Sequence, residues 1–543
     1  MLRPLLRLCA FAALCTTASA GWRSSLFPEN WQPQFKDSAG RFLHDFSYAG
    51  YHRGEIPLPT PTGPQIDVTQ APFSADVTGV KDATAAIQAA LDQAAKSGGG
   101  IVYMPSGTYR IAPPAGEKVA LKVSGDHTVL RGAGVERTFL VNEEPVMREK
   151  TVIEIAQPKP TWWYAEGNWV KASPASADIP SGATVIPVED PSLFAKDDLV
   201  VVRSDPTDRF INELGMTGKW TVQNMKGRGL AFCRTVLAVD PAAKSITVDV
   251  PTRYLLRKED NARVVKMPGN MIREVGLEDF SLGMREHTGE GTDDEAILNT
   301  PGTPDYEMHQ SHAIVFNSAE NCWMRRVNSF CPAGNTRGIN VLSNGVKLER
   351  SRFVTIEKCD WRNTQFKGGG GNGYLYTLHS EECLIRDCRA ENGRHNYDIA
   401  MMYCSGNVIL DCLSKDGRLA SDYHMYFAVA NLFDCTTCDG DNLEAKYRPY
   451  GGNPMHGVTT SQSVFWNTFG QRYGPTSFIY AGKPNHREQV IVQSKQFGDG
   501  YVIGTHGPAS KIDSTNFVEG EGQDGLEPRS LYLEQLSRRL GKK

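Results

Sequence analysis

Short apolar segments separated by Asn-Gly or Asp-Gly turns recur along the C-terminal half of the chain. The segments TIEKCDW, LIRDCRA, VILDCLS and LFDCTTC place Cys359, Cys388, Cys412 and Cys435 at one position of successive units, 29, 24 and 23 residues apart. A repeat of about 20 to 30 residues built from short β-branched and aromatic runs is typical of a solenoid, in which stacked units bury one continuous core. We therefore predict a parallel coil over residues 270–505 with these four cysteines in one inward stack.

A helix is predicted ahead of the coil. It begins at Asp82 as N-cap and ends at Gly98-Gly99-Gly100, and strands are expected at 98–111 and 127–134. Its apolar stripe consists of Ala86, Ile87, Ala90, Leu91 and Ala94. A second amphipathic helix is predicted at 530–540. We expect it to cover the last rung of the coil, because an uncovered rung would present unpaired edge strands.

The segment DATAAIQAALDQAAKSGGGIVYMPSGTYRI resembles the opening module of the pectate-lyase superfamily of right-handed parallel β-helices, with the helix as the cap of the coil. The resemblance covers residues 80–140 and departs from the usual acidic pair before the helix, since the chain has Asp82-Ala83-Thr84. It implies an all-β fold, a right-handed parallel β-helix with an N-terminal capping helix. It does not imply one reaction, because relatives include lyases, glycosidases, epimerases and phage tailspikes.

The predicted organisation has six segments. Residues 141–265 break the repeat with Trp- and Pro-rich sequence followed by the strands ATVIPV, DLVVVRS and SITVDV, which indicates a β-rich insertion that walls one side of a cleft. The segments are a signal peptide (1–20), an N-terminal extended segment (21–75), the start of the β-helix with its capping helix (76–140), the β-rich insertion (141–265), the main β-helix (266–505) and a C-terminal cap (506–543).

Composition narrows the class of partner. The 543 residues are 40% hydrophobic and 22% charged, and the formal net charge of −4 provides no basic field for nucleic acid or a membrane surface. The first residues have the form of a secretory signal, with Arg3 and Arg7, the apolar stretch LCAFAALC, and Ala18-Ser19-Ala20 as the cleavage site. We expect a secreted or periplasmic monomer without nucleic-acid or membrane partners.

Ten cysteines remain after removal of the signal segment. An even number in an oxidising compartment favours disulfides, whereas a repeating position favours small buried thiols. We predict buried free thiols, with Cys435 and Cys438 as the exception.

Candidate chemistry lies on two consecutive rungs. Arg394 and Asp398 follow the turn at Asn392-Gly393, and Arg418 and Asp422 follow the turn at 416–417 at the same offsets. Neighbouring rungs of a parallel coil lie about 4.8 Å apart, so arginine is expected beside arginine and carboxylate beside carboxylate. Like charges this close are unfavourable unless another group lies between them. The alternative is that each Arg–Asp pair is a salt bridge that holds a loop.

Strand alternation predicts which side chains share the outer face of the sheet. The outer set is Tyr374, Tyr376, Asp398, Asp422, His424 and Tyr426, and Leu375, Thr377 and His379 are expected to point inward. Loops at 367–373 and 440–456 border this face, and the second supplies Lys446, Arg448 and His456 as substrate-binding candidates. Aromatic rings that stack on sugars, beside carboxylates, a histidine and cations, predict a polysaccharide groove.

Three functions fit this set of residues. In a lyase acting on a uronic-acid polymer by β-elimination, Arg394 and Arg418 neutralise the substrate carboxylate, His424 is the base and Tyr426 the acid. In a glycoside hydrolase, Asp398 and Asp422 are the two catalytic carboxyl groups. The third function is an epimerase or a non-catalytic carbohydrate-binding β-helix. We place the lyase first, because paired cations suit an acidic substrate.

The sequence identifies no cofactor with certainty, and calcium is the one candidate. Asp398 and Asp422 offer oxygen ligands of the kind that calcium takes. The acidic stretch GEGTDDE (289–295) is a second place for calcium, although a solvated loop is the simpler interpretation. The sequence leaves open the metal, the sugar and its linkage.

Overall fold

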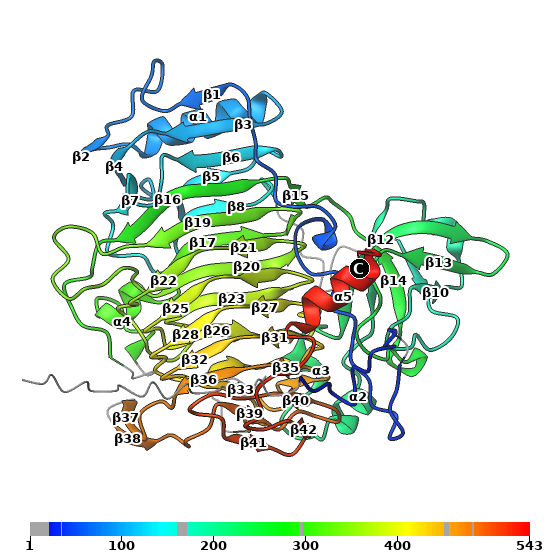
Figure 1. Ribbon diagram of the computed structural model, residues 1–543. Coiled ribbons are helices and arrows are strands. Elements are labelled where there is room, and N and C mark those ends of the chain that lie inside the picture. Colours follow the sequence, from blue (N-terminus) through cyan, green and yellow to red (C-terminus); the bar gives the residue numbers. More distant parts are fainter. Residues whose placement is uncertain are drawn as a thin grey trace, which may run out of the picture.

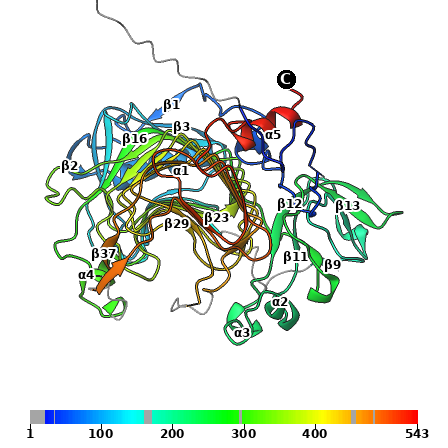
Figure 2. The same cartoon turned by 60° about the horizontal axis from the view of Figure 1, so that its bottom comes forward.

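The computed structural model describes residues 21–33, 35–159, 171–292, 297–449, 456–480 and 483–542. The expected signal segment, residues 1–20, lies outside these ranges. The chain forms a right-handed parallel β-helix in which successive strands stack along one axis, as Figure 1 shows for strands β16 to β36. Figure 2 looks along the coil and shows the inserted sheet beside it. The predicted fold class is therefore confirmed.

Three sheets make up the coil, and we number them here as sheets 1, 2 and 3. Sheet 1 contains β1 (Gln65–Asp67), β2 (Thr78–Asp82), β3 (Gly100–Met104), β4 (Gly107–Ile111), β6 (Thr128–Gly132), β7 (Thr138–Asn142), β16 (Gly276–Met284), β19 (Trp323–Ser329), β21 (Thr355–Glu357), β24 (Leu384–Arg386), β27 (Val408–Leu410), β31 (Leu432–Asp434), β35 (Val464–Trp466), β40 (Tyr501–Ile503) and β42 (Phe517–Glu519).

Sheet 2 contains β5 (Val119–Val123), β8 (Thr151–Ile155), β15 (Ile272–Arg273), β17 (His312–Asn317), β18 (Ala319–Glu320), β20 (Asn344–Arg352), β23 (Tyr374–Glu381), β26 (His395–Ile399), β29 (Ser421–Tyr423), β33 (Leu443–Ala445), β39 (Val492–Ser494) and β41 (Ile512–Ser514). Sheet 3 contains β22 (Asp360–Arg362), β25 (Arg389–Glu391), β28 (Leu413–Lys415), β32 (Thr437–Asp439) and β36 (Phe469–Arg472). The coil thus continues to Glu519, beyond the predicted limit at 505.

Helix α1 (Thr84–Lys96) packs its apolar stripe on the first strands of the coil. Ile87, Ala90, Leu91 and Ala94 are buried in the same core as β3 and β5. A carboxylate oxygen of Asp82 accepts the backbone N–H of Thr84 at 2.7 Å. The predicted helix is therefore present, but its N-cap residue is Ala83 rather than Asp82, which is the last residue of β2.

The interior of the coil contains the expected cysteine stack, with one correction. Cys359, Cys388 and Cys412 lie buried at equivalent positions, and the Sγ atoms of Cys388 and Cys412 face the carbonyls of Ile356 and Ile385 one rung back. Cys435 does not continue the stack: Leu413 pairs with Thr437, which leaves Thr436 to follow Cys412. Cys435 takes the left-handed turn position before it (φ 54°) and contacts the carbonyl of Arg529. The prediction for Cys435 was wrong by one residue.

All ten cysteines in the described part of the chain are free thiols, and nine of them are buried. The prediction of free thiols is confirmed, and it extends to Cys435 and Cys438 as well. Small thiols fill the inner corners of the coil without the backbone shifts that a cross-link would require.

The insertion forms its own antiparallel sheet beside sheet 2. Its strands, in spatial order, are β10 (Val185–Pro187), β13 (Ser245–Val248), β12 (Ala231–Asp240), β11 (Leu199–Arg203), β14 (Arg263–Lys266) and β9 (Ala172–Pro174). Buried charge pairs attach it to the coil: Arg253 donates two hydrogen bonds to Glu382, at 2.8 and 2.6 Å. Helices α2 (Asp208–Glu213) and α3 (Val222–Met225) lie in the same segment.

The C-terminal helix α5 (Leu531–Arg539) lies on the side of the coil rather than over its last rung. Leu531 and Tyr532 pack on the outer face of sheet 1 with Leu432 and Trp466, together with residues of the N-terminal segment. A carboxylate oxygen of Asp434 accepts the N–H of Tyr532 at 2.9 Å, which anchors the helix there. The expectation of a helix over the final rung was therefore wrong.

The remaining α-helix and strands are short. Helix α4 (Pro304–Met308) precedes β17, β30 (Ala428–Val429) pairs with β34 (Thr460–Ser461), and β37 (Ser477–Tyr480) pairs with β38 (Lys483–His486) in a hairpin. No helix among the described residues has the length and hydrophobicity needed to span a membrane.

Candidate active site

A cavity of about 1120 Å³ lies on the outer face of sheet 2, where the site was predicted. It extends across the rungs from β17 to β39, with side chains of β23, β26 and β29 near its centre. The described residues that line it include Gln310, His312, Lys347, Tyr374, Thr377, His379, Arg394, His395, Asp398, His424, Met425, Glu444, Lys446, Arg448, His456 and Phe478. Cations and imidazoles therefore surround the carboxylates of its floor.

One column of outward side chains runs through the floor. Backbone pairing aligns Lys347 with Thr377, Thr377 with Asp398, Asp398 with Asp422, and Asp422 with Glu444. Three carboxylates thus occupy consecutive rungs, and Asp398 and Asp422 are 1% and 0% exposed. The stacking of carboxylate on carboxylate that the repeat predicted is confirmed, and Glu444 extends it by one rung.

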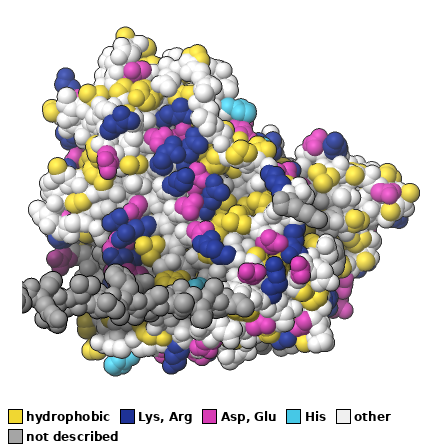
Figure 3. Space-filling model, viewed as in Figure 1, with side chains coloured by type: hydrophobic (Ala, Val, Ile, Leu, Met, Phe, Trp, Pro, Cys, Tyr) yellow, Lys and Arg dark blue, Asp and Glu magenta, His cyan; other side chains and the backbone are white. Residues whose placement is uncertain are grey.

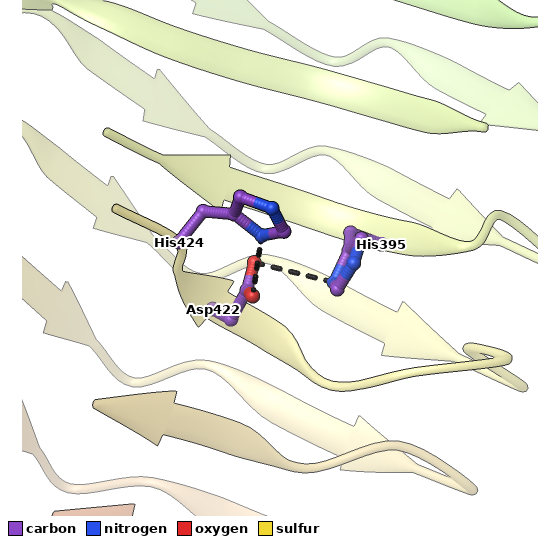
Figure 4. A group of neighbouring side chains, drawn as sticks. All are labelled: His395, Asp422 and His424. Carbon is purple, nitrogen blue, oxygen red and sulfur yellow. Dashed lines mark hydrogen bonds and ion pairs between the residues drawn. The ribbon is translucent and has the colours of Figure 1, made fainter. Parts of the chain in front are cut away.

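His424 is held from below by Asp422. The Nδ1 of His424 lies 3.0 Å from Oδ2 of Asp422, and His395 contributes its Nδ1 at 3.2 Å from Oδ1 of the same carboxylate (Figure 4). The Nδ1–H of His395 also donates to the carbonyl of Ala420 at 2.6 Å. Asp422 therefore orients His424 so that its Nε2 faces the cavity, where it lies 3.4 Å from the hydroxyl of Tyr374.

Tyr374 keeps its proton in this setting. Burial raises the pKa of its phenol above the ordinary value, against the opposing effect of Arg394. The guanidinium of Arg394 donates to the Tyr374 hydroxyl at 3.0 Å. A neutral phenol beside an imidazole nitrogen is an arrangement that can give a proton on one side and take one on the other.

The central rung leaves a buried carboxylate incompletely bonded. Neither oxygen of Asp398 has a hydrogen-bond partner among the described residues, and its nearest ionic neighbours are His379 at 3.5 Å and His424 at 3.9 Å. His379 in turn faces Glu349 at 3.4 Å. Burial and Lys347 lower the pKa of His379, but the two carboxylates outweigh them and the net pKa is raised.

Arg448 compensates the negative charge of the next two carboxylates in the column. Its guanidinium contacts both Asp422, at 2.5 Å, and Glu444, and Lys446 contacts Glu444 at 2.6 Å. Although burial alone would raise it, Arg448 and the two histidines hold the pKa of Asp422 below the ordinary value. His456 completes this side, with its Nε2 3.3 Å from that of His424. The insertion supports the rim of the cavity at this point, because the indole N–H of Trp220 donates to the carbonyl of His456.

The cavity therefore contains Asp398, His424, Tyr374, Arg394, Lys446, Arg448 and His456 as predicted, with Asp422 directly beneath. Four predicted residues are not among the described residues that line it: Asp422, which lies beneath the floor, and Tyr376, Tyr426 and Arg418. The described residues of the insertion do not line it either; they support its rim instead of forming its wall.

Each misplaced residue has a structural reason. Leu375 and Tyr376 both belong to the core, where Tyr376 stacks on Tyr397, so the alternation slips by one residue in β23. The chain turns at Tyr426 and Phe427, both left-handed (φ 62° and 49°), and Tyr426 accepts a hydrogen bond from Arg228 of the insertion. Arg418 points to the carbonyls of Lys367 and Ile479 and borders a separate hollow of about 450 Å³.

The slip in β23 also explains what the sequence prediction missed. Thr377 and His379, expected inside, face the cavity beside Asp398 and Glu349. His312 and Lys347 were not singled out because their rungs carry no copy of the repeated motif, whereas His395 lies within the first copy but shares by simple alternation the inner face of Tyr397. The pairing of β20 with β23 aligns Lys347 with Thr377. This pairing contains an irregularity between Glu349 and Ser351, so strand alternation alone could not predict the alignment.

The donor set does not suit calcium. Calcium takes six to eight oxygen ligands, whereas the floor combines imidazole nitrogens with carboxylates, and Asp422 and Glu444 are already engaged by Arg448. The second calcium candidate, residues 289–295, falls partly outside the described residues.

Comparison with known proteins places the fold in a class. Residues 68–168 match the family described as Rhamnogalacturonase A/epimerase, pectate lyase-like. The resemblance to the pectate-lyase superfamily is thereby confirmed: this is a parallel β-helix protein whose N-terminal part is pectate lyase-like.

Particular relatives match over short stretches. Mannuronan C5-epimerase AlgE6 of Azotobacter vinelandii is 37% identical over 75 residues, which is 14% of this chain and 9% of that protein. Alginate lyase 7 of the same organism is 40% identical over 68 residues, 12% of this chain and 8% of that protein. The match thus spans less than a tenth of either relative.

Solved structures that align with most of the chain are more distant in sequence. The tailspike gp61 of Pseudomonas phage phi297 has a TM-score of 0.43 and 11% identity, covering 85% of this chain and 73% of that chain. An iota-carrageenase complexed to iota-carrageenan fragments has a TM-score of 0.37 and 10% identity, covering 75% and 60%.

Proposed function

We propose that this protein is an exported enzyme that cleaves a uronic-acid-containing polysaccharide by β-elimination. The observation that carries the proposal is the placement of His424: Asp422 fixes its Nδ1 at 3.0 Å, and its Nε2 lies 3.4 Å from Tyr374 in a cavity rich in cations. The names of the relatives add support, since an alginate lyase and mannuronan C5-epimerases act on uronate polymers.

The reaction assigns one task to each group. Arg394 and the cations of the 446–456 side bind the uronate carboxylate and disperse the charge that develops when the adjacent carbon loses its proton. The Nε2 of His424 takes that C5 proton, and Tyr374 gives its own proton to the departing glycosidic oxygen. The C4–O4 bond breaks as the C4–C5 double bond forms. Tyr374 thus takes the acid role that the sequence prediction gave to Tyr426.

A hydrolase is less well supported. Inversion or retention requires one carboxyl group that stays protonated to serve as acid. The pKa of Asp422 is lowered, and its carboxylate faces Arg448 and two histidines, so it is an orienting anion rather than a proton donor. Asp398 lines the cavity but is only 1% exposed, and neither of its oxygens has a hydrogen-bond partner among the described residues.

Epimerisation is the second candidate. It begins with the same proton removal, but the carbon is then reprotonated from the opposite face and the chain stays intact. The similarity to mannuronan C5-epimerases specifically favours it.

Three readouts separate these functions on a panel of polyuronates and neutral glycans. Elimination produces an unsaturated uronide, seen as new ultraviolet absorbance. Epimerisation incorporates deuterium at C5 from D₂O without shortening the chain. Reducing ends that appear without the chromophore would favour a hydrolase, and binding without any turnover would leave a carbohydrate-binding protein.

A further inference from the structure

Two imidazoles and a carboxylate meet on the floor of the cavity. A nitrogen of His395, a carboxylate oxygen of Asp422 and a nitrogen of His424 all lie within 4.8 Å of one another. Figure 4 shows the three side chains converging from adjacent rungs, with Asp422 between the rings. Their exposed fractions are 1%, 0% and 7%. Such a set, two nitrogens and one oxygen at close range, is the ligand set of many transition-metal sites.

Two of these groups have unused bonding capacity. The Nε2 of His395 and the Oδ1 of Asp422 are buried and have no hydrogen-bond partner among the described residues. Because the Nδ1–H of His395 donates to Ala420, the lone pair of this ring lies on Nε2. A neutral imidazole and an ionised carboxylate are the forms in which these residues bind metals.

We propose that His395, Asp422 and His424 bind a divalent transition-metal ion of the zinc class, and that this ion inhibits the enzyme by occupying its base. Three protein ligands leave a fourth position open, as in zinc sites that exchange small ligands. Each neutral imidazole gives one nitrogen lone pair to the ion and keeps its single ring proton on the other nitrogen, while the carboxylate gives an oxygen lone pair and the ion loses bound water. No proton is released and no oxidation or reduction occurs, and His424 has no lone pair left to act as the base. The inhibition depends on the proposed function, whereas metal binding itself does not.

The position of Arg448 limits the affinity. Its guanidinium lies 2.5 Å from the Oδ2 of Asp422, so a cation on the other oxygen meets a positive neighbour. We therefore expect reversible binding that a chelator removes, weaker than the binding at a structural zinc site where no such charge is present.

Metal binding is measured first, without any substrate. The EDTA-treated, dialysed full-length protein is titrated with Co²⁺, followed by its visible absorption bands, and with Zn²⁺, followed by calorimetry. We expect one ion per chain. His395→Gln should weaken both titrations more than about tenfold. The matched control is His312→Gln, a cavity histidine of β17 outside the trio, which should bind as the wild type does. Equal loss in both variants, or no bands in the wild type, would overturn the site.

Inhibition is measured second, on whichever substrate shows turnover. The EDTA-treated enzyme should be active, saturating Zn²⁺ should reduce its rate more than about tenfold, and EDTA should restore it. His395→Gln should keep most of its own metal-free rate in the same Zn²⁺. If EDTA removes activity and Zn²⁺ restores it, the ion is a cofactor and the inhibitory assignment is wrong. If no substrate is turned over, the proposed function fails while the cobalt titration still decides the site.

Discussion

Two columns of outward side chains run along neighbouring sheets of the same coil, and they differ in the order of their charges. On sheet 1, backbone pairing aligns Arg131, Glu278, Arg325, Glu357 and Arg386 on successive rungs, so the sign alternates. Glu278 lies 2.8 Å from Arg131 on one side and from Arg325 on the other. Figure 3 views the molecule from this side, with basic and acidic side chains intermixed across the face.

On sheet 2 the column stacks like charges. Asp398, Asp422 and Glu444 follow one another, and histidines and Arg448 from neighbouring positions compensate them incompletely. Alternating charges across adjacent strands are stabilising and like charges are not. The first column therefore has the arrangement expected from selection for stability, and the second the arrangement expected where chemistry has overridden it. The unsatisfied oxygens of Asp398 and Asp422 mark the same difference.

The comparison predicts its largest effect for His424. His424→Ala should reduce turnover by about 10³-fold, because the general base is removed. The melting temperature should stay close to that of the wild type, since the polar contacts of the ring are all with residues of the cavity and its floor. A parallel assay of rate and melting temperature checks both parts, and a variant that loses rate because it has lost structure would contradict the assignment.

The reverse result is expected in the alternating column. Glu278 is fully buried and also accepts the indole N–H of Trp323 at 2.7 Å. Glu278→Gln leaves two arginines without their shared anion and should cost about 3 to 5 kcal/mol of unfolding free energy. Urea unfolding measures the loss. At a temperature where the variant is folded, its rate per molecule should equal that of the wild type. A lower rate of the folded variant would show that this column also contributes to turnover, and the proposed difference between the columns would be wrong.

A pair of tyrosines provides a matched test of the acid. Tyr374→Phe should lower turnover by about 10²-fold, because the proton for the leaving oxygen is lost. Tyr426→Phe removes a hydrogen bond to Arg228 outside the cavity, so its cost is about 1 kcal/mol of stability with little change in rate. If the two variants behave in the opposite way, Tyr426 is the acid after all.

The success of the sequence prediction followed the repeat. Cys359, Cys388 and Cys412 could be stacked, and Asp398 aligned with Asp422, because equal spacing fixes the register between rungs. The prediction failed where single residues break the alternation. Tyr376 is inside because the alternation slips by one residue in β23. Tyr426 turns away because its backbone is left-handed, a conformation that is not expected from a tyrosine in the sequence. His379 and His395 stayed hidden for the same reason, since their facing depends on those irregularities.

The smallest effect concerns stability at the centre of the stacked column. Asp398 is a buried carboxylate beside Asp422, with no hydrogen-bond donor on either oxygen among the described residues. Asp398→Asn keeps its shape and removes one of the like charges, so the protein should gain up to about 1 kcal/mol in unfolding free energy while its turnover falls. Glu357→Gln on sheet 1 is the control, because Glu357 pairs with Arg386 and its loss should destabilise. Denaturant unfolding of both variants measures whether each substitution raises or lowers the free energy of unfolding. A loss at Asp398 as large as that at Glu357 would show that the carboxylate stabilises the fold, and the contrast between the two columns would not hold.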